Sequence, residues 1–149
     1  MKLMLVGKTG SGKTTLAQRI NGMDINYKKT QMILFENNII DTPGEYIENK
    51  FYYKALTVTA SNADIIAFVQ SALDEDTLFP PKFSTMFTGK RIIGIITKKD
   101  LQLESSNAEN FLKCAGAEEI YYIGLNDKNE IIRLKERLGI GDESKNSNS

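Results

Sequence analysis

The stretch Gly7-Lys8-Thr9-Gly10-Ser11-Gly12-Lys13-Thr14 matches G-x-x-x-x-G-K-[ST], the pattern of the phosphate-binding loop of nucleoside triphosphatases. The apolar run before it, Leu3–Val6, predicts a buried strand. Thr15–Ile20 after it predicts a helix, because Leu16 and Ile20 are four residues apart. The alternative, a glycine-rich turn that binds nothing, is disfavoured because strand, loop and helix follow in the order that phosphate binding requires.

The residue types of this loop suit a triphosphate bound together with magnesium. Glycines allow backbone N–H groups to surround the β-phosphate, and the helix N-terminus adds partial positive charge. Lys13 is expected to bridge the β- and γ-phosphates, and the Thr14 hydroxyl is expected to bind Mg²⁺. The residues expected to contact the nucleotide in this loop are Thr9, Gly10, Ser11, Gly12, Lys13, Thr14 and Thr15.

Length and charge limit the class of protein. The 149 residues suffice for one domain, expected over 1–140, followed by a polar tail over 141–149 that is expected to be disordered. Lys plus Arg and Asp plus Glu number 19 each, so no net charge favours nucleic acid or an anionic membrane. No apolar stretch approaches the length of a membrane span, and the first strand begins too early for a signal peptide. We therefore expect a cytoplasmic protein.

Cysteine and histidine usage narrows the chemistry further. The one cysteine, Cys114, permits no internal disulfide and suits a reducing cytosol. We expect it to be a small core residue on a helix. The sequence contains no histidine, which excludes Ser–His triads and histidine-liganded metals.

Apolar runs alternate with amphipathic segments along the chain. The expected strands are Leu3–Val6, Gln31–Phe35, Asn38–Ile40, Ile65–Val69, Ile92–Ile96 and Ile120–Ile123. The expected helices are Thr15–Ile20, Phe51–Val58, Pro81–Phe87, a segment from Ser106 to a stop at Gly116, and Glu130–Leu138. This alternation predicts an α/β fold with a mostly parallel central sheet and helices on both faces. Gln31–Phe35 is expected to be an antiparallel edge strand paired with Asn38–Ile40.

Asp41-Thr42-Pro43-Gly44-Glu45 follows an apolar strand, where ligands bind in open α/β sheets. Asp41 is expected to hold Mg²⁺ through a water molecule, and Gly44 leaves its backbone N–H free to meet a γ-phosphate. An ordinary Pro-Gly turn is the alternative, and the phosphate loop upstream makes it the weaker one.

Thr97-Lys98-Lys99-Asp100 ends another apolar strand. The Asp100 carboxylate can accept hydrogen bonds from guanine N1–H and its exocyclic amino group, donors that adenine lacks in this arrangement. The stem of Lys98 can lie over the purine ring. Because a mispaired buried carboxylate costs several kcal/mol, Asp100 alone can select the base. The alternative is a solvated charged turn.

Thr30 lies in the polar segment Tyr27–Gln31, between the first helix and the Asp41 strand. A second hydroxyl ligand for Mg²⁺ that also senses the γ-phosphate belongs in that loop. A plain surface threonine is the alternative.

The phosphate loop, Thr30, the Asp41–Glu45 segment and the Thr97–Asp100 segment follow one another in the order found in small GTPases of the translation-factor-like class. The chain resembles this class over nearly its whole length. A closer resemblance is to the ethanolamine- and propanediol-utilisation GTPase-like family of bacteria. It is carried by the Gly7–Thr14 loop near the initiator methionine, Lys29-Thr30-Gln31, Asp41-Thr42-Pro43-Gly44-Glu45-Tyr46, and Ala63-Asp64 leading into Ile65–Gln70. The resemblance implies a three-layer Ras-like P-loop fold, binding of GTP or GDP with Mg²⁺, and a link to catabolic microcompartments.

Three positions depart from the GTPase pattern. Thr97 stands where most GTPases have asparagine, so a hydrogen bond from the base site to the phosphate loop is expected to change. Leu125 lies in a loop that lacks the usual Ser-Ala-Lys, and its backbone N–H is expected to meet the guanine oxygen. Glu45 replaces the water-orienting glutamine, and its carboxylate either acts as a base toward water or repels the γ-phosphate.

The leading hypothesis is a Mg²⁺-dependent GTP-binding protein with slow GTP hydrolysis, acting as a switch or assembly factor. Its expected catalytic residues are Lys13, Thr30, Gly44 and Glu45, and its expected metal ligands are Thr14, Thr30 and Asp41. No arginine stands in a switch-like loop, which suggests a protein partner, a dimer or slow hydrolysis. The resemblance implies that such a partner is a microcompartment component or an activating protein. A homodimer stays open. The alternatives are an ATP-dependent kinase acting on a small carboxylate and a nucleotide-binding scaffold that does not hydrolyse.

Overall fold

The structure, a computed structural model, describes residues 1–22, 33–36, 38–98, 100, 107–124 and 128–140. In that part of the chain, six strands form one sheet in the order β2-β3-β1-β4-β5-β6. The strands are β1 Leu3–Val6, β2 Leu34–Glu36, β3 Ile39–Asp41, β4 Ile65–Ser71, β5 Arg91–Thr97 and β6 Glu119–Tyr122. All neighbouring pairs are parallel except β2 and β3, which pair antiparallel at one edge.

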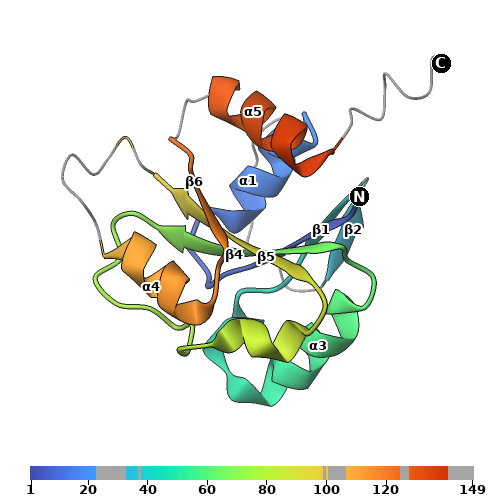
Figure 1. The fold of residues 1–149 in the computed structure, drawn as a ribbon, viewed down its shortest axis with the longest axis vertical. Helices are drawn as coiled ribbons and strands as arrows, with labels where there is room; N and C mark the ends of the chain where they lie inside the picture. Colours follow the sequence, from blue (N-terminus) through green and yellow to red (C-terminus); the bar gives the residue numbers. More distant parts are fainter. Residues whose placement is uncertain (23–32, 37, 99, 101–106, 125–127, 141–149) are drawn as a thin grey trace.

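Helices cover both faces of this sheet, as the alternation of segments predicts. The helices are α1 Lys13–Ile20, α2 Glu45–Glu48, α3 Tyr53–Ala60, α4 Ala108–Ala115 and α5 Lys128–Leu138, with 3-10 turns η1 Lys50–Tyr52 and η2 Phe83–Phe87. Figure 1 shows α1 and α5 on one side of the strands and α3 and α4 on the other. Two apolar clusters correspond to these two layers.

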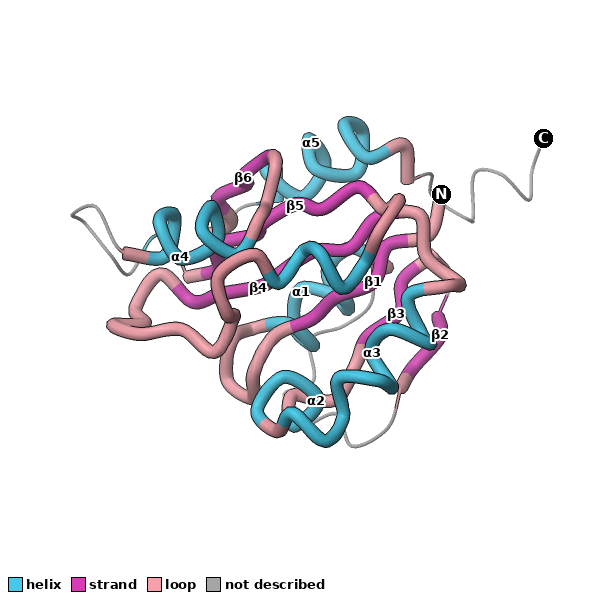
Figure 2. Tube along the Cα trace, turned by 60° about the horizontal axis from the view of Figure 1, so that its bottom comes forward, coloured by secondary structure: helices cyan, strands magenta, loops and turns pink. Residues whose placement is uncertain are grey.

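Strand β1 lies at the centre of the molecule. All four of its side chains are 0% exposed, because β3 and β4 flank it and helices cover both faces. The chain leaves β1 toward β3 on one side and then crosses to β4 on the other. Such a reversal of strand order opens a crevice at the carboxyl ends of the strands, which is where ligands bind in this class of sheet. Figure 2 shows the central strands running side by side between the helical layers.

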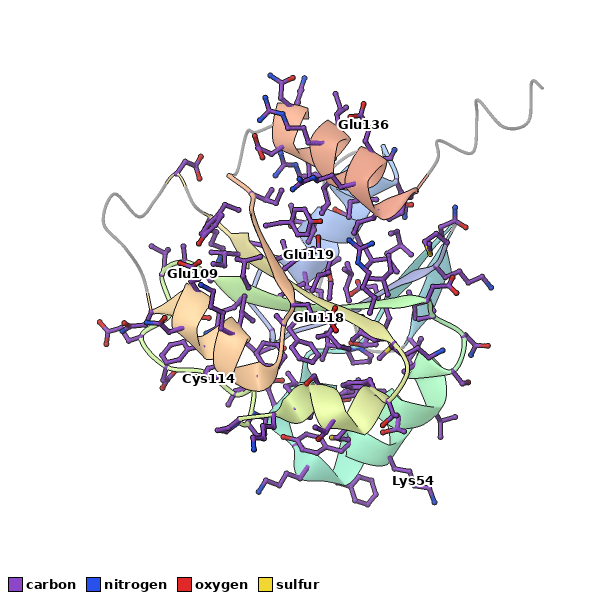
Figure 3. All side chains as sticks on the ribbon, in the orientation of Figure 1. Lys54, Glu109, Cys114, Glu118, Glu119 and Glu136 are labelled. Carbon is purple, nitrogen blue, oxygen red and sulfur yellow. The ribbon has the colours of Figure 1, made fainter. Side chains whose placement is uncertain are left out.

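The prediction that Cys114 is a core residue is wrong, because its side chain is exposed on α4 (Figure 3). The buried residues of α4 are Ala108, Leu112 and Ala115, which share one face at helical spacing. Cys114 precedes Ala115 by one residue, a rotation of about 100° away from that face.

Two weakly patterned segments form helices with different bounds from those predicted. Phe51–Val58 divides into η1 and α3, and the Asn49 side chain accepts a hydrogen bond from Phe51 N at 2.9 Å where η1 begins. Pro81–Phe87 contributes only the 3-10 turn η2, from Phe83 onward. Ser106 and the predicted tail at 141–149 lie outside the described residues. Of the helices in the described residues, none combines the length and apolar character needed to cross a bilayer.

Candidate functional site

The predicted phosphate loop connects β1 to α1 over the carboxyl end of the central strand. Gly10 and Gly12 have φ angles of 85° and 89°, a region that side-chain-bearing residues enter only with strain. Gly12 is the N-cap of α1, so the loop leads directly into the positive end of a helix. Thr15, half-buried, follows in the first turn of that helix. The motif thus has the strand–loop–helix setting expected for it.

Lys13 and Thr14 of α1 meet Asp41 at the end of β3. Lys13 Nζ lies 2.7 Å from Asp41 Oδ1 and also donates to the Thr42 carbonyl oxygen. Thr14 Oγ1 donates to Asp41 Oδ2 at 3.0 Å. Lys13 and Asp41 are each 4% exposed, so this ion pair is buried. Residues 28 positions apart along the chain therefore form one contact group.

The oxygen atoms of this group suit a hard divalent cation. Mg²⁺ prefers carboxylate and hydroxyl oxygens and is bound through few protein ligands together with substrate phosphates. The Thr14 hydroxyl oxygen and Asp41 Oδ2 provide two such ligand oxygens next to each other. The residues present thus fit a magnesium ion. Thr30, the third predicted ligand, lies outside the described residues.

Thr42 has a role that the sequence did not reveal. Its side chain is 0% exposed and donates from Oγ1 to the Leu5 carbonyl oxygen at 2.8 Å, while its own carbonyl accepts from Lys13. Thr42 therefore attaches the end of β3 to β1 and helps to fix the lysine. A buried threonine between an apolar strand and a Pro-Gly turn was the available signal.

The turn at Gly44 lies against the phosphate loop. A Cβ added to Gly44 would be 2.4 Å from both the backbone nitrogen and Oγ1 of Thr9. The φ angle of Gly44 is −58°, so lack of space rather than backbone conformation requires glycine here. Glu45 begins α2 with an exposed side chain, and Thr9 Oγ1 also lies 3.4 Å from Glu48 Oε2. The turn predicted to face a γ-phosphate is thus in contact with the predicted phosphate loop.

The segment after β5 is joined to the same loop by two hydrogen bonds. Thr97 Oγ1 donates to the Ser11 carbonyl oxygen, and Lys98 Nζ donates to the Gly10 carbonyl oxygen at 2.8 Å. Thr97 is 6% exposed, and Lys98 adopts a left-handed backbone conformation with φ of 58°. Thr97 stands where most GTPases have asparagine, and the link from this segment to the phosphate loop is here made by the threonine hydroxyl, which is shorter than an asparagine side chain.

Asp100 lies beside Gly124, two residues after the end of β6. A Cβ added to Gly124 would be 3.3 Å from Asp100 Cγ, so glycine leaves room for the carboxylate. Arg19 Nη1 of α1 donates to the Gly124 carbonyl oxygen at 2.8 Å. Arg19 was not among the predicted site residues, and it fixes the end of β6 to the helix that follows the phosphate loop. Leu125 lies outside the described residues.

The sequence of this chain also resembles those of known proteins. A family described as "Ethanolamine utilisation - propanediol utilisation" matches residues 1–139. The chain belongs to this family. The family expected from the motifs is thereby confirmed.

Relatives in this family are bacterial proteins of similar length. A propanediol utilization protein PduV of Citrobacter freundii is 42% identical over 126 residues, covering 81% of this chain and 81% of the relative. A protein named "Probable acetate kinase EutP" in Salmonella typhimurium is 31% identical over 140 residues, covering 92% of this chain and 88% of that protein.

A solved structure shares the fold. The crystal structure of a bacterial selenocysteine-specific elongation factor, EF-Sec, aligns with a TM-score of 0.64 at 22% identity, covering 93% of this chain and 28% of that protein. At this identity the likeness concerns the fold alone, and it confirms the three-layer Ras-like α/β architecture. The family member described here therefore carries the fold that its motifs predict.

Proposed function

We propose that this protein binds GTP with Mg²⁺ and hydrolyses it slowly. The observation that carries the proposal is that the segment after β5 is hydrogen-bonded to the predicted phosphate loop. Thr97 and Lys98, which precede the predicted base-reading carboxylate of Asp100, both bond to carbonyl oxygens of the predicted phosphate loop. A single nucleotide lying across these segments would have its base and its phosphates held by one connected structure.

The phosphate end is proposed to be held by α1 and the residues around it. The loop N–H groups and the helix N-terminus attract the phosphate oxygens, and the Lys13 ammonium neutralises part of their charge. When bound by Thr14, Thr30 and Asp41, Mg²⁺ would neutralise charge on the β- and γ-phosphate oxygens. Thr42 attaches the end of β3 to β1 through its hydrogen bond to the Leu5 carbonyl oxygen, and its own carbonyl oxygen holds Lys13.

The base end is proposed to select guanine. The Asp100 carboxylate accepts from guanine N1–H and the 2-amino group, while adenine presents no such pair of donors. The Lys98 stem lies over the ring as its Nζ remains on Gly10, and the Leu125 N–H meets the guanine oxygen. Arg19 supports this end by holding the Gly124 carbonyl.

Hydrolysis is proposed to be slow. In-line attack of water on the γ-phosphorus breaks the bond to the β–γ bridging oxygen, and the Gly44 N–H is proposed to meet the γ-phosphate. Glu45 begins α2 beside this turn, and Glu48 approaches Thr9, so two carboxylates add negative charge where an anion must react. The four arginines lie on α1, β5 and α5 rather than in the loop or the turn. A protein partner that supplies positive charge would therefore accelerate the reaction.

Base choice tests this proposal most simply. We expect unlabelled GTP and GDP to displace a fluorescent GTP analogue at concentrations at least about tenfold below those needed for ATP, since an unpaired Asp100 carboxylate costs more than about 1.4 kcal/mol. Equal displacement by ATP would contradict guanine recognition. The same titration with and without Mg²⁺ tests the metal site. In Thr14→Ala, nucleotide affinity should depend less on Mg²⁺, while the preference for GTP over ATP should be unchanged.

A second function is favoured by the name of three relatives, "Probable acetate kinase EutP". In that reaction an acetate oxygen, rather than water, attacks the γ-phosphorus, giving acetyl phosphate and a nucleoside diphosphate. Incubation with γ-labelled GTP or ATP, with and without acetate, distinguishes the two. Acetate-dependent transfer of label to acetyl phosphate supports the kinase, whereas acetate-independent release of phosphate supports hydrolysis. If GTP binds tightly and neither acetyl phosphate nor free phosphate forms, the protein is a nucleotide-binding scaffold that does not hydrolyse.

We further propose the biological setting from family membership. The protein acts as a switch or assembly factor in ethanolamine or propanediol utilisation, in the cytoplasm and in association with a bacterial microcompartment. Residues 1–140 form the nucleotide-binding unit, and neither nucleic acid nor membrane is a partner. Its partner is proposed to be a microcompartment component, an activating protein or a second copy of the chain.

A further inference from the structure

The phosphate loop contains a second lysine that none of the predicted roles uses. Lys8 Nζ forms an ion pair with Asp74 Oδ1 at 3.4 Å, and the two side chains are 32% and 15% exposed. Asp74 lies in the segment that follows β4, so this pair joins the phosphate loop to a surface loop outside the site described above.

Asp74 is held in place by buried groups beneath it. Its backbone N–H donates to the Ser71 carbonyl at 3.2 Å, and its other carboxylate oxygen lies 3.4 Å from Gln70 Nε2. Gln70 is 3% exposed and also donates to the Asp76 carbonyl at 2.8 Å, while its Oε1 accepts from Thr77 at 2.8 Å. The carboxylate is thus a fixed partner for Lys8, unlike a charge on a freely moving surface side chain.

Lys8 adjoins the part of the phosphate loop that contacts the Gly44 turn, while its own ammonium group extends toward the segment after β4. Its neighbour Thr9 is the residue in closest approach to Gly44, the glycine proposed to meet the γ-phosphate. Lys13, at the other end of the loop, is buried against Asp41 and Thr42. The long flexible stem of a lysine can move its ammonium group by several ångströms, so Lys8 can exchange one anionic partner for another.

We propose that Lys8 is a specificity-determining residue that favours the triphosphate over the diphosphate, and that Asp74 competes with the γ-phosphate for it. This inference rests on the proposed GTP binding and adds to it a residue pair that sets the ratio of the two affinities. A triphosphate draws Lys8 away from Asp74, whereas a diphosphate leaves the pair intact. Because Asp74 is anchored on Gln70 at the start of the surface loop, the presence of the γ-phosphate is transmitted to that loop.

A double-variant cycle tests the proposal through binding alone. The dissociation constants of GDP and of GTPγS, a slowly hydrolysed GTP analogue, are measured with Mg²⁺ at low ionic strength for wild type, Lys8→Met, Asp74→Asn and the double variant. Their ratio reports the preference for the triphosphate. A part-exposed charge pair is worth up to about 1 kcal/mol, so Lys8→Met should lower this preference by about two- to fivefold.

The competition between anions gives the cycle a distinctive pattern. Asp74→Asn should raise the preference for GTPγS by a similar factor, because Lys8 no longer has a competing partner. The double variant should match Lys8→Met, since Asp74 acts only through Lys8. Added salt should reduce both effects. Lys113→Met, which removes an exposed pair with Glu109 on α4, is the matched control and should leave the ratio unchanged.

Two results would overturn the inference. The first is a Lys8→Met variant whose ratio equals that of wild type while both nucleotides still bind, which leaves the proposed function standing. The second is an Asp74→Asn effect of equal size with and without Lys8, which would show that Asp74 acts independently. Failure of both nucleotides to bind wild type would instead refute the proposed function and this inference with it.

Discussion

At the residue scale, the buried pair of Lys13 and Asp41 is the most consequential contact in the candidate site. Each side chain is almost fully removed from water, and each has further hydrogen bonds to Thr42 or Thr14. A buried ion pair contributes little net stability against an apolar pair, but removal of one partner leaves a buried charge uncompensated. The pair thus links the integrity of the site to the stability of the protein.

We therefore expect Lys13→Met to lower the free energy of unfolding by about 3 kcal/mol, because the Asp41 carboxylate loses its cation in a buried setting. The measurement is urea unfolding followed by circular dichroism. Lys13→Met combined with Asp41→Asn should recover most of that loss, since no charge remains buried. A double variant as unstable as the sum of the single variants would show that the pair is not coupled.

At the element scale, the end of α4 illustrates how a single glycine decides the packing of a helix. Gly116 caps α4 with φ of 104°, and a Cβ there would lie 1.9 Å from Ser84 Oγ and 2.6 Å from Ser84 Cβ. Gly139, which follows α5, also has positive φ, 69°, but nothing lies within 4 Å of its added Cβ. The two glycines share a backbone requirement and differ in available space.

Gly116→Ala should consequently destabilise the protein by about 3 kcal/mol, of which about 1 kcal/mol is backbone strain and the rest displacement of the neighbouring turn. Gly139→Ala, the matched control, should cost only the backbone share of about 1 kcal/mol. Chemical unfolding of the two variants under identical conditions measures the difference. Equal losses would mean that contact with Ser84 contributes nothing.

The same scale shows what the sequence could reveal about the elements. Leu3–Val6 was predicted with its true bounds, and Ile65–Val69 and Ile92–Ile96 lie within the longer strands β4 and β5, because burial on both faces leaves a strong signal. The stop of α4 at Gly116 was also predicted, since a left-handed cap favours glycine. The 3-10 form and later start of η2, and the exposure of Cys114, were not predicted, because both depend on which neighbouring element covers a weakly patterned segment.

In the candidate site, too, local sequence patterns could be interpreted, whereas contacts that depend on the tertiary structure could not. The motifs identified residues whose chemistry is local, such as the loop glycines and Lys13. Contacts between segments far apart in sequence escaped prediction, including Thr42 with Leu5, Arg19 with Gly124 and Lys8 with Asp74. These contacts are made by ordinary residue types whose partners are set only by the order of strands in the sheet.

At the scale of the whole molecule, the strand order brings the site together. Segments that follow β1, β3 and β5 come into contact because these strands run parallel and end at the same edge of the sheet. Hydrogen bonds from Thr97 and Lys98 then join the predicted base side to the phosphate side. Recognition of guanine by Asp100 is the central claim that depends on this arrangement.

Exchange of the base-reading group tests that claim most directly. Asn in place of Asp keeps an acceptor for N1–H but presents an amide donor, which suits the 2-oxo group of xanthine and opposes the 2-amino group of guanine. Equilibrium binding of GTP and xanthosine triphosphate to wild type and Asp100→Asn is therefore the decisive measurement. We predict that Asp100→Asn weakens GTP at least about tenfold and strengthens xanthosine triphosphate. Unchanged affinities for both nucleotides would contradict guanine recognition by Asp100.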